Sequence, residues 1–114
     1  MLTLAPPDAV WMPVDVSLPD ETGRRRTHRF HVRLRRVGRA EFRSIADRLT
    51  TGELDDDGLL HEVVLDWRDV QDADGGALAF SRDALDRLID IPEVVPALIQ
   101  AWFAAHSGEG ARKN

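Results

Sequence analysis

The sequence contains no cysteine among its 114 residues. Disulfide bonds and thiolate metal sites are therefore excluded, and the absence fits a reducing cytosol. Tyrosine is also absent, and aromatic residues make up only 6% of the chain. No apolar run approaches the length of a membrane span, and the first residues lack the basic start and apolar core of a signal peptide. We therefore expect neither a membrane span nor secretion.

The residues that are present are typical of one folded domain. Hydrophobic residues make up 43% of the chain and charged residues 31%, as in globular rather than disordered proteins. The net charge of −5 conceals an asymmetry, because residues 1–40 carry 8 arginines and 4 acids, whereas residues 41–114 carry 7 basic and 16 acidic residues. A positive front and a negative back can attract each other within one chain or between neighbouring copies.

The first part of the chain predicts a β-hairpin. Residues 1–8 contain two prolines and no periodicity, so we expect a flexible arm there. Apolar and polar residues alternate from 10 to 18, which indicates a half-buried strand, and Pro13 makes it an edge strand because proline cannot donate to a ladder. Residues 19–23 have the composition of a turn. The second strand alternates an apolar face with a basic face, namely Phe30, Val32 and Leu34 against Arg29, His31, Arg33 and Arg35.

The rest of the chain predicts helices between residues 39 and 106. Apolar residues recur at helical period after Gly38 and again after the acids at 55–57. The inner face of the first helix is Phe42, Ile45, Ala46 and Leu49, and that of the second is Leu59, Leu60, Val63, Val64 and Trp67. We therefore expect the second helix to extend to Trp67.

A turn, a short helix and an apolar last helix are predicted after Trp67. Gly75 permits the positive φ of a sharp turn. Ser81 is suited to cap the short helix, with Phe80 and Leu85 as the two ends of a hydrophobic staple. Pro92 ends that helix, because proline restricts the residue before it. The residues for which we predict a structural role are Trp67, Gly75, Phe80, Ser81, Leu85, Leu88, Pro92 and Leu98.

The predicted fold is α+β, with an N-terminal β-hairpin (residues 9–37) packed on a small cluster of about four helices (residues 39–106). An isolated hairpin is marginally stable in water, so its apolar face must pack on the helices or join another sheet. We expect a single domain over residues 9–106. Residues 107–114 are polar and rich in glycine, which predicts a disordered tail.

No spacing of residues indicates catalysis, a cofactor or a metal. With Gly75 at the sixth position of a calcium-binding loop, Val70 and Ser81 fall at the first and twelfth positions, and neither is a carboxylate. The nearby acids are therefore interpreted as solvated carboxylates around a turn. His61 begins a zinc-protease pattern, but Leu65 stands where the second histidine is required. We expect a protein that is not an enzyme and has no cofactor.

The run from Trp67 to Leu98 carries three motifs in order, W-x-x-V-x-D-x-D-G, F-S-x-x-x-L-x-x-L and I-P-x-V-x-x-A-L. This combination resembles the tail assembly chaperones of long, non-contractile-tailed bacteriophages. The likeness extends more loosely back to Phe30. The matching residues are Trp67, Val70, Asp72, Asp74, Gly75, Phe80, Ser81, Leu85, Leu88, Ile91, Pro92, Val94, Ala97 and Leu98.

The resemblance implies a non-enzymatic protein of the infected bacterial cytoplasm that is absent from the mature virion. Such a protein binds and solubilises the tape measure protein, recruits tail tube subunits around it and self-associates. The family typically makes a longer product by programmed ribosomal frameshifting. Lys113 and Asn114 can be encoded by a run of adenines that ends in cytosine, which is a slippery sequence.

Two surfaces are candidates for partner binding. Arg29, Arg33 and Arg35 lie on the basic face of the second strand, and Trp102 and Phe103 end the apolar stripe of the last helix. The two aromatics are either interface anchors or core residues. One alternative function is a nucleic-acid-binding module that uses the arginine-rich hairpin, although the acidic domain and the lack of interleaved aromatics disfavour it. Another is a prophage scaffold or adaptor with a different partner.

Overall fold

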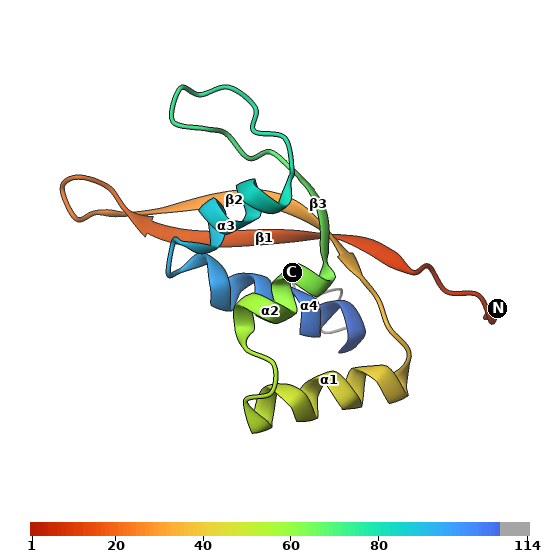
Figure 1. The fold of residues 1–114 in the computed structure, drawn as a ribbon. Coiled ribbons are helices and arrows are strands. Elements are labelled where there is room, and N and C mark those ends of the chain that lie inside the picture. The colour runs from red at the N-terminus through yellow and green to blue at the C-terminus, as the bar shows by residue number, and fades with distance from the viewer. Residues whose placement is uncertain (108–114) are drawn as a thin grey trace.

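The structure, a computed structural model, describes residues 1–107. Its elements are β1 (Ala9–Pro19), β2 (Arg25–Arg35), α1 (Arg39–Thr51), α2 (Asp56–Val63), β3 (Val64–Arg68), α3 (Arg82–Ile89) and α4 (Val94–Ser107). The strands form one antiparallel sheet in the order β1-β2-β3, and the helices cover one face of it (Figure 1). This is the predicted α+β arrangement. Of the predicted tail, Ser107 ends α4, and residues 108–114 lie outside the described residues.

The predicted hairpin is confirmed, and β1 pairs with β2 over the whole length of both strands. Its turn is held by the Asp20 carboxylate, which accepts hydrogen bonds from the amides of Thr22 and Arg24 at 2.9 and 3.0 Å. In the middle of β1, buried and exposed side chains alternate as predicted. β1 lies at the edge of the sheet, where Pro13 costs no ladder hydrogen bond. Residues 1–8 form neither a helix nor a strand and are exposed.

The predicted second helix is shorter than expected. α2 ends at Val63, and residues 64–68 form β3, which pairs with the C-terminal part of β2. The expectation that this helix extends to Trp67 is therefore wrong. The cause is tertiary, because β2 offers an unpaired edge and the β-branched valines at 63 and 64 suit a strand at least as well as a helix.

Trp67 nevertheless lies in the core, as predicted, with 5% of its surface exposed. Its Nε1 donates a hydrogen bond to the Leu78 carbonyl at 2.7 Å, and the Phe80 ring meets it edge to face at 5.1 Å between centroids. Val64 and Trp67 are three residues apart, so a regular strand would point them to opposite faces. An irregularity in the β2–β3 register at Leu65 lets both face the core.

The turn and the cap after β3 are confirmed. Gly75 has a φ of +83°, in the left-handed region that favours glycine. Ser81 caps α3, since its Oγ accepts a hydrogen bond from the Ala84 amide at 3.0 Å. On the inward side of α3, Leu85 is fully buried and Leu88 is half-buried.

α4 packs against β1 and against α2 and α3, whereas α1 is the most peripheral helix (Figure 1). Pro92 lies in the exposed turn before α4, as predicted. Because α4 begins at Val94, Pro96 falls in its first turn, where an amide has no partner within the helix. Leu98 and Trp102 are fully buried.

We predict that Ser81→Ala lowers the free energy of unfolding by about 1 kcal/mol, because the first turn of α3 loses its side-chain acceptor. The measurement is equilibrium unfolding in urea. Ser44→Ala, at an exposed position within α1, is the matched control and should change the free energy of unfolding by less than about 0.5 kcal/mol. Equal effects of the two substitutions would contradict a capping role for Ser81.

Candidate partner-binding surfaces

The three predicted arginines lie together on the face of the sheet that the helices leave uncovered. Arg29 donates hydrogen bonds through Nε and Nη2 to the two Asp15 carboxylate oxygens at 2.8 and 2.9 Å. These bonds hold the pKa of Asp15 below its ordinary value and raise the pKa of Arg29. Arg35 bonds Glu41 at 3.0 Å. Arg33 is exposed, and within residues 1–107 no ion pair involves it.

Other arginines of the basic front are also paired within the chain. Arg25 lies 3.3 Å from Glu93, and Arg26 lies 3.2 Å from Asp20. Arg36 instead donates to the Ala105 carbonyl at 3.1 Å. Much of the positive charge that the sequence places on residues 24–36 is therefore balanced by carboxylates of the same molecule, which leaves less for a polyanion.

The end of α4 does not present both aromatics to a partner. Trp102 is fully buried, its Nε1 donates to the Arg35 carbonyl at 2.9 Å, and its ring stacks on Phe42 with centroids 5.1 Å apart. The interpretation of Trp102 as an interface anchor is therefore corrected, and Trp102 is a core residue. Phe103 is half-buried and meets the Phe42 ring edge to face at 5.5 Å.

A partly exposed apolar strip nevertheless runs along α4. Val95, Ile99 and Phe103 are spaced four residues apart, so they lie above one another on one side of the helix. Each is half-buried against the core rather than within it. We call these three residues the α4 flank. Of the two aromatics that the sequence offered as partner-binding residues, Phe103 is the one that remains partly accessible.

His106 adjoins this aromatic cluster and was not distinguished from the other histidines by the sequence. The Val37 amide donates to its Nε2 at 3.0 Å, so Nδ1 carries the proton and donates to the Trp102 carbonyl at 2.9 Å. Burial lowers the pKa of His106 below the ordinary 6.5, the Trp102 carbonyl opposes this, and the charge of Arg36 lowers the pKa further. Its partner Val37 is 69 residues away in the chain, which no local pattern could reveal.

A second surface, also missed by the sequence, is a groove of about 560 Å³ beside β2 with both apolar and polar lining residues. Residues 27–30 of β2 form one wall, and residues 69–72, after β3, form the other. Apolar side chains from the corner between α3 and α4 also line it, namely Leu88, Ile91 and Val94. We call it the β2 groove. Predicting it required the position of β3, which the sequence pattern assigned to a helix.

The acidic turn is organised by hydrogen bonds from backbone amides to the Asp72 carboxylate. Asp72 Oδ1 accepts from the amides of Asp74 and Gly76 at 3.0 and 3.2 Å.

Within residues 1–107, no three histidine, aspartate or glutamate side chains converge as a metal site requires. The same part of the chain contains no single helix with the length and apolarity to cross a bilayer, although α3 and α4, bent by 113°, meet both criteria as a pair.

Residues 1–107 form a small α+β domain whose helices cover one face of the sheet, and its surface includes the α4 flank and the β2 groove. Comparisons of the chain with protein-family models, with curated proteins and with solved structures found no match. The assignment of a function therefore depends on the motifs of the sequence and on the surfaces described above.

We predict weak retention on a heparin column, with elution at low salt, because most of the arginines on β2 already have an acceptor or a carboxylate within the chain. The double variant Asp15→Asn, Glu41→Gln frees two of them and should elute at higher salt. Strong retention of the unaltered protein would instead favour the nucleic-acid-binding alternative.

We predict that the free energy of unfolding falls as the pH is lowered from 7 through 6.5, because the unfolded chain takes up a proton at His106 more readily than the folded chain does. Protonation of His106 in the fold would remove the acceptor for the Val37 amide. Urea unfolding as a function of pH measures the effect. In His106→Gln this part of the pH dependence should disappear, and identical slopes in the two proteins would contradict the assignment.

Proposed function

We propose that this protein is a tail assembly chaperone of a long, non-contractile-tailed bacteriophage or prophage. It acts in the cytoplasm of the host bacterium, binds the tape measure protein, keeps it soluble and recruits tail tube subunits around it. It is a binding protein rather than an enzyme, and it is absent from the mature virion. The structural observation that carries the proposal is the α4 flank.

The α4 flank has the spacing that a helical partner needs. A tape measure protein is a very long helical protein whose apolar stripes aggregate when they are exposed to water. Val95, Ile99 and Phe103 are spaced so that they form a matching strip, and an amphipathic helix can lay its apolar face against such a strip. Covering the stripe in this way would keep the long partner soluble until tube subunits replace the chaperone.

The motifs that resemble the family have two roles in the fold. Trp67, Leu85 and Leu98 are buried in the core. Gly75 and Ser81 form the turn and the cap that lead the chain from β3 into α3. These motifs support the proposal because they specify the scaffold that carries α4.

The test is co-expression with a tape measure fragment from the same phage or prophage. We expect the fragment to be soluble and to co-purify with the chain. Ile99→Ser and Phe103→Ser should each weaken binding roughly tenfold, since each removes an apolar side chain from the contact. Isothermal titration with the soluble fragment measures the dissociation constant.

The matched control is Gln100→Ser, which removes a side chain from the exposed side of the same helix and should leave the dissociation constant unchanged. Circular dichroism and thermal unfolding establish that each variant is folded. A fragment that stays insoluble with and without the chain would sink the proposal. If all three variants bind equally, the α4 flank is not the contact.

A further inference from the structure

One half of β2 has a strand neighbour on only one side. β3 pairs with β2 from His31 to Leu34, whereas β2 begins at Arg25. After β3 the chain leaves the sheet in a loop that rises away from β2 (Figure 1). Within residues 1–107, no strand therefore covers the edge of β2 at residues 25–30, which we call the open edge.

The open edge presents unpaired backbone groups. The Arg36 amide donates to the Asp8 carbonyl, so even-numbered residues of β2 point their backbone groups toward β1. Because the direction alternates along a strand, Arg25, Thr27 and Arg29 point their amides and carbonyls toward the open edge. Such a row of donors and acceptors is a template for another strand.

The β2 groove lies directly beside the open edge and can receive side chains from an added strand. Thr27 and Arg29 belong to both, because residues 27–30 form one wall of the groove. Val70, Leu88 and Ile91 supply apolar surface on the other sides. In strand addition, the backbone bonds supply affinity and pockets for alternate side chains supply specificity. The missing strand should therefore carry apolar residues at every second position.

Residues 1–5, Met-Leu-Thr-Leu-Ala, have this pattern. They are exposed and do not pack on their own domain. Met1, Leu2 and Leu4 are three of the four large apolar residues that are exposed in the described chain, with 125%, 85% and 94% relative exposure. Leu2 and Leu4 would lie on the same side of a strand. Residues 1–7 carry no charged side chain, so their burial in the groove removes no charge of the arm's own side chains from water.

We propose that the N-terminal arm of one copy adds to the open edge of β2 in the next copy, with Leu2 and Leu4 in its β2 groove. The added strand is antiparallel, with Met1, Thr3 and Ala5 opposite Arg29, Thr27 and Arg25. In this register each of the three odd-numbered arm residues faces a residue of β2 with free backbone groups. Pro6 and Pro7 end the pairing because neither has an amide hydrogen to donate.

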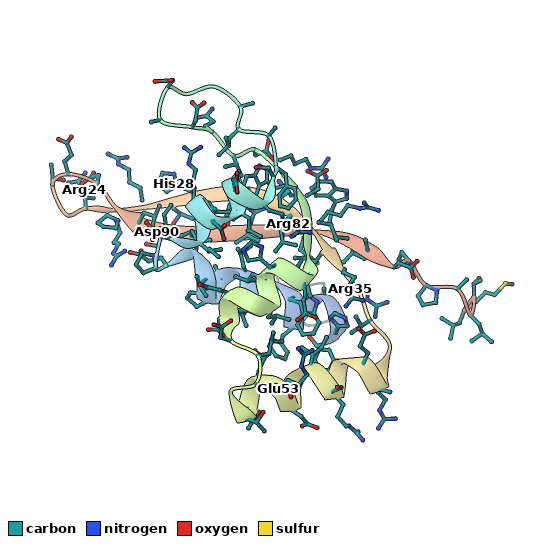
Figure 2. All side chains as sticks on the ribbon, viewed as in Figure 1. Arg24, His28, Arg35, Glu53, Arg82 and Asp90 are labelled. Carbon is teal, nitrogen blue, oxygen red and sulfur yellow. The ribbon has the colours of Figure 1, made fainter. Side chains whose placement is uncertain are left out.

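The antiparallel direction follows from what lies at each end of the open edge. It brings Asp8 of the arm to the hairpin turn, where Figure 2 labels Arg24. A parallel arm would instead direct its prolines and Asp8 into residues 69–72, which form a wall of the groove and include Asp69 and Asp72. The hairpin turn contains Asp20 and Glu21 as well as Arg24, so space, rather than charge, selects the antiparallel direction.

The arm cannot reach the open edge of its own molecule. Ala9 lies opposite Arg35, eight residues along β2 from Thr27, which is a distance of about 26 Å in a strand. Thr3 lies six residues before Ala9, so even a fully extended arm spans at most about 22 Å between them. The arm also leaves at the end of the molecule opposite the hairpin turn (Figure 1). The acceptor must therefore be a second copy.

This contact is heterologous, because the arm of one copy meets a different surface on the next. Repetition builds an open chain of copies or a closed ring. The contact leaves the α4 flank unused, and the inference does not depend on the proposed function. Its experiments use the chain alone, so their failure is distinguishable from a failure to bind a tape measure fragment.

The first experiment is the double variant Leu2→Ser, Leu4→Ser in the full chain, measured by light scattering at high micromolar concentration. We expect the unaltered protein to form assemblies of several copies and the variant to have the mass of one chain, 12.8 kDa. The temperature of unfolding at low concentration should not change, because the arm does not pack on its own domain.

The matched control for that variant is Trp11→Ser, which removes the remaining exposed large apolar side chain, located on the other face of the sheet, and should leave the assemblies intact. A monomeric unaltered protein overturns the proposal. So do assemblies that persist in the arm variant, since another segment or surface would then join the copies.

The second experiment uses the absence of cysteine from the chain. Thr3 and Thr27 face each other as a hydrogen-bonded pair in the proposed register, about 5.5 Å apart between Cα atoms, a separation that a disulfide spans. The variant Thr3→Cys, Thr27→Cys should give a ladder of disulfide-linked multimers on oxidation. A mixture of the two single variants should give a linked species of two chains.

The control for crosslinking is Thr3→Cys with Thr50→Cys, because Thr50 is exposed on α1 and distant from the groove in the fold. It should give no ladder under the same oxidation. If the Thr50 variant crosslinks as readily as the Thr27 variant, or if neither does, the register is refuted.

Discussion

The apolar side of the hairpin has to be covered, and the rest of the fold depends on how α4 covers it. β1 and β2 are long strands with helices on only one face, so a single apolar helix must supply most of the contact. Trp102 anchors that helix by stacking on Phe42 and by donating to the Arg35 carbonyl at 2.9 Å. That carbonyl lies just beyond the end of the β3 ladder, so the indole satisfies a backbone group that no strand reaches.

The basic front (residues 1–40) and the acidic back (residues 41–114) form ion pairs with each other inside one molecule. Arg25 and Arg35 reach Glu93 and Glu41 within the same molecule, at 3.3 and 3.0 Å. Such exposed pairs contribute little to stability individually. Their main consequence is that about half of the front arginines, including Arg25 and Arg35, already have a carboxylate partner inside the same molecule. The α4 flank and the β2 groove, which both expose apolar side chains, are therefore also candidates for contacts between molecules.

Those two surfaces lie in different parts of the fold and suit different partners. The α4 flank presents side chains at helical spacing, which suits a helical partner such as a tape measure protein. The β2 groove adjoins unpaired backbone groups, which suits an extended segment. The proposed function would use both kinds of contact, one to the tape measure protein and one to a neighbouring copy.

The sequence by itself determined the features that depend on near neighbours in the chain. The hairpin strands follow from period-two alternation, the edge position of β1 from Pro13, and the cap of α3 from Ser81. Gly75 adopts the positive φ that its turn requires. These features were predictable because each acts through the backbone within a few residues, where local sterics and hydrogen bonds decide the conformation.

Only the tertiary structure decided the features that depend on remote contacts. Residues 64–68 satisfy a helical pattern, but pairing with β2 makes them a strand and leaves the open edge beside the groove. The Trp102 indole and the His106 ring likewise find their partners in Arg35 and Val37, which are 67 and 69 residues away in the chain. A local pattern records which side chains are apolar, but it cannot record which distant backbone groups are left unpaired.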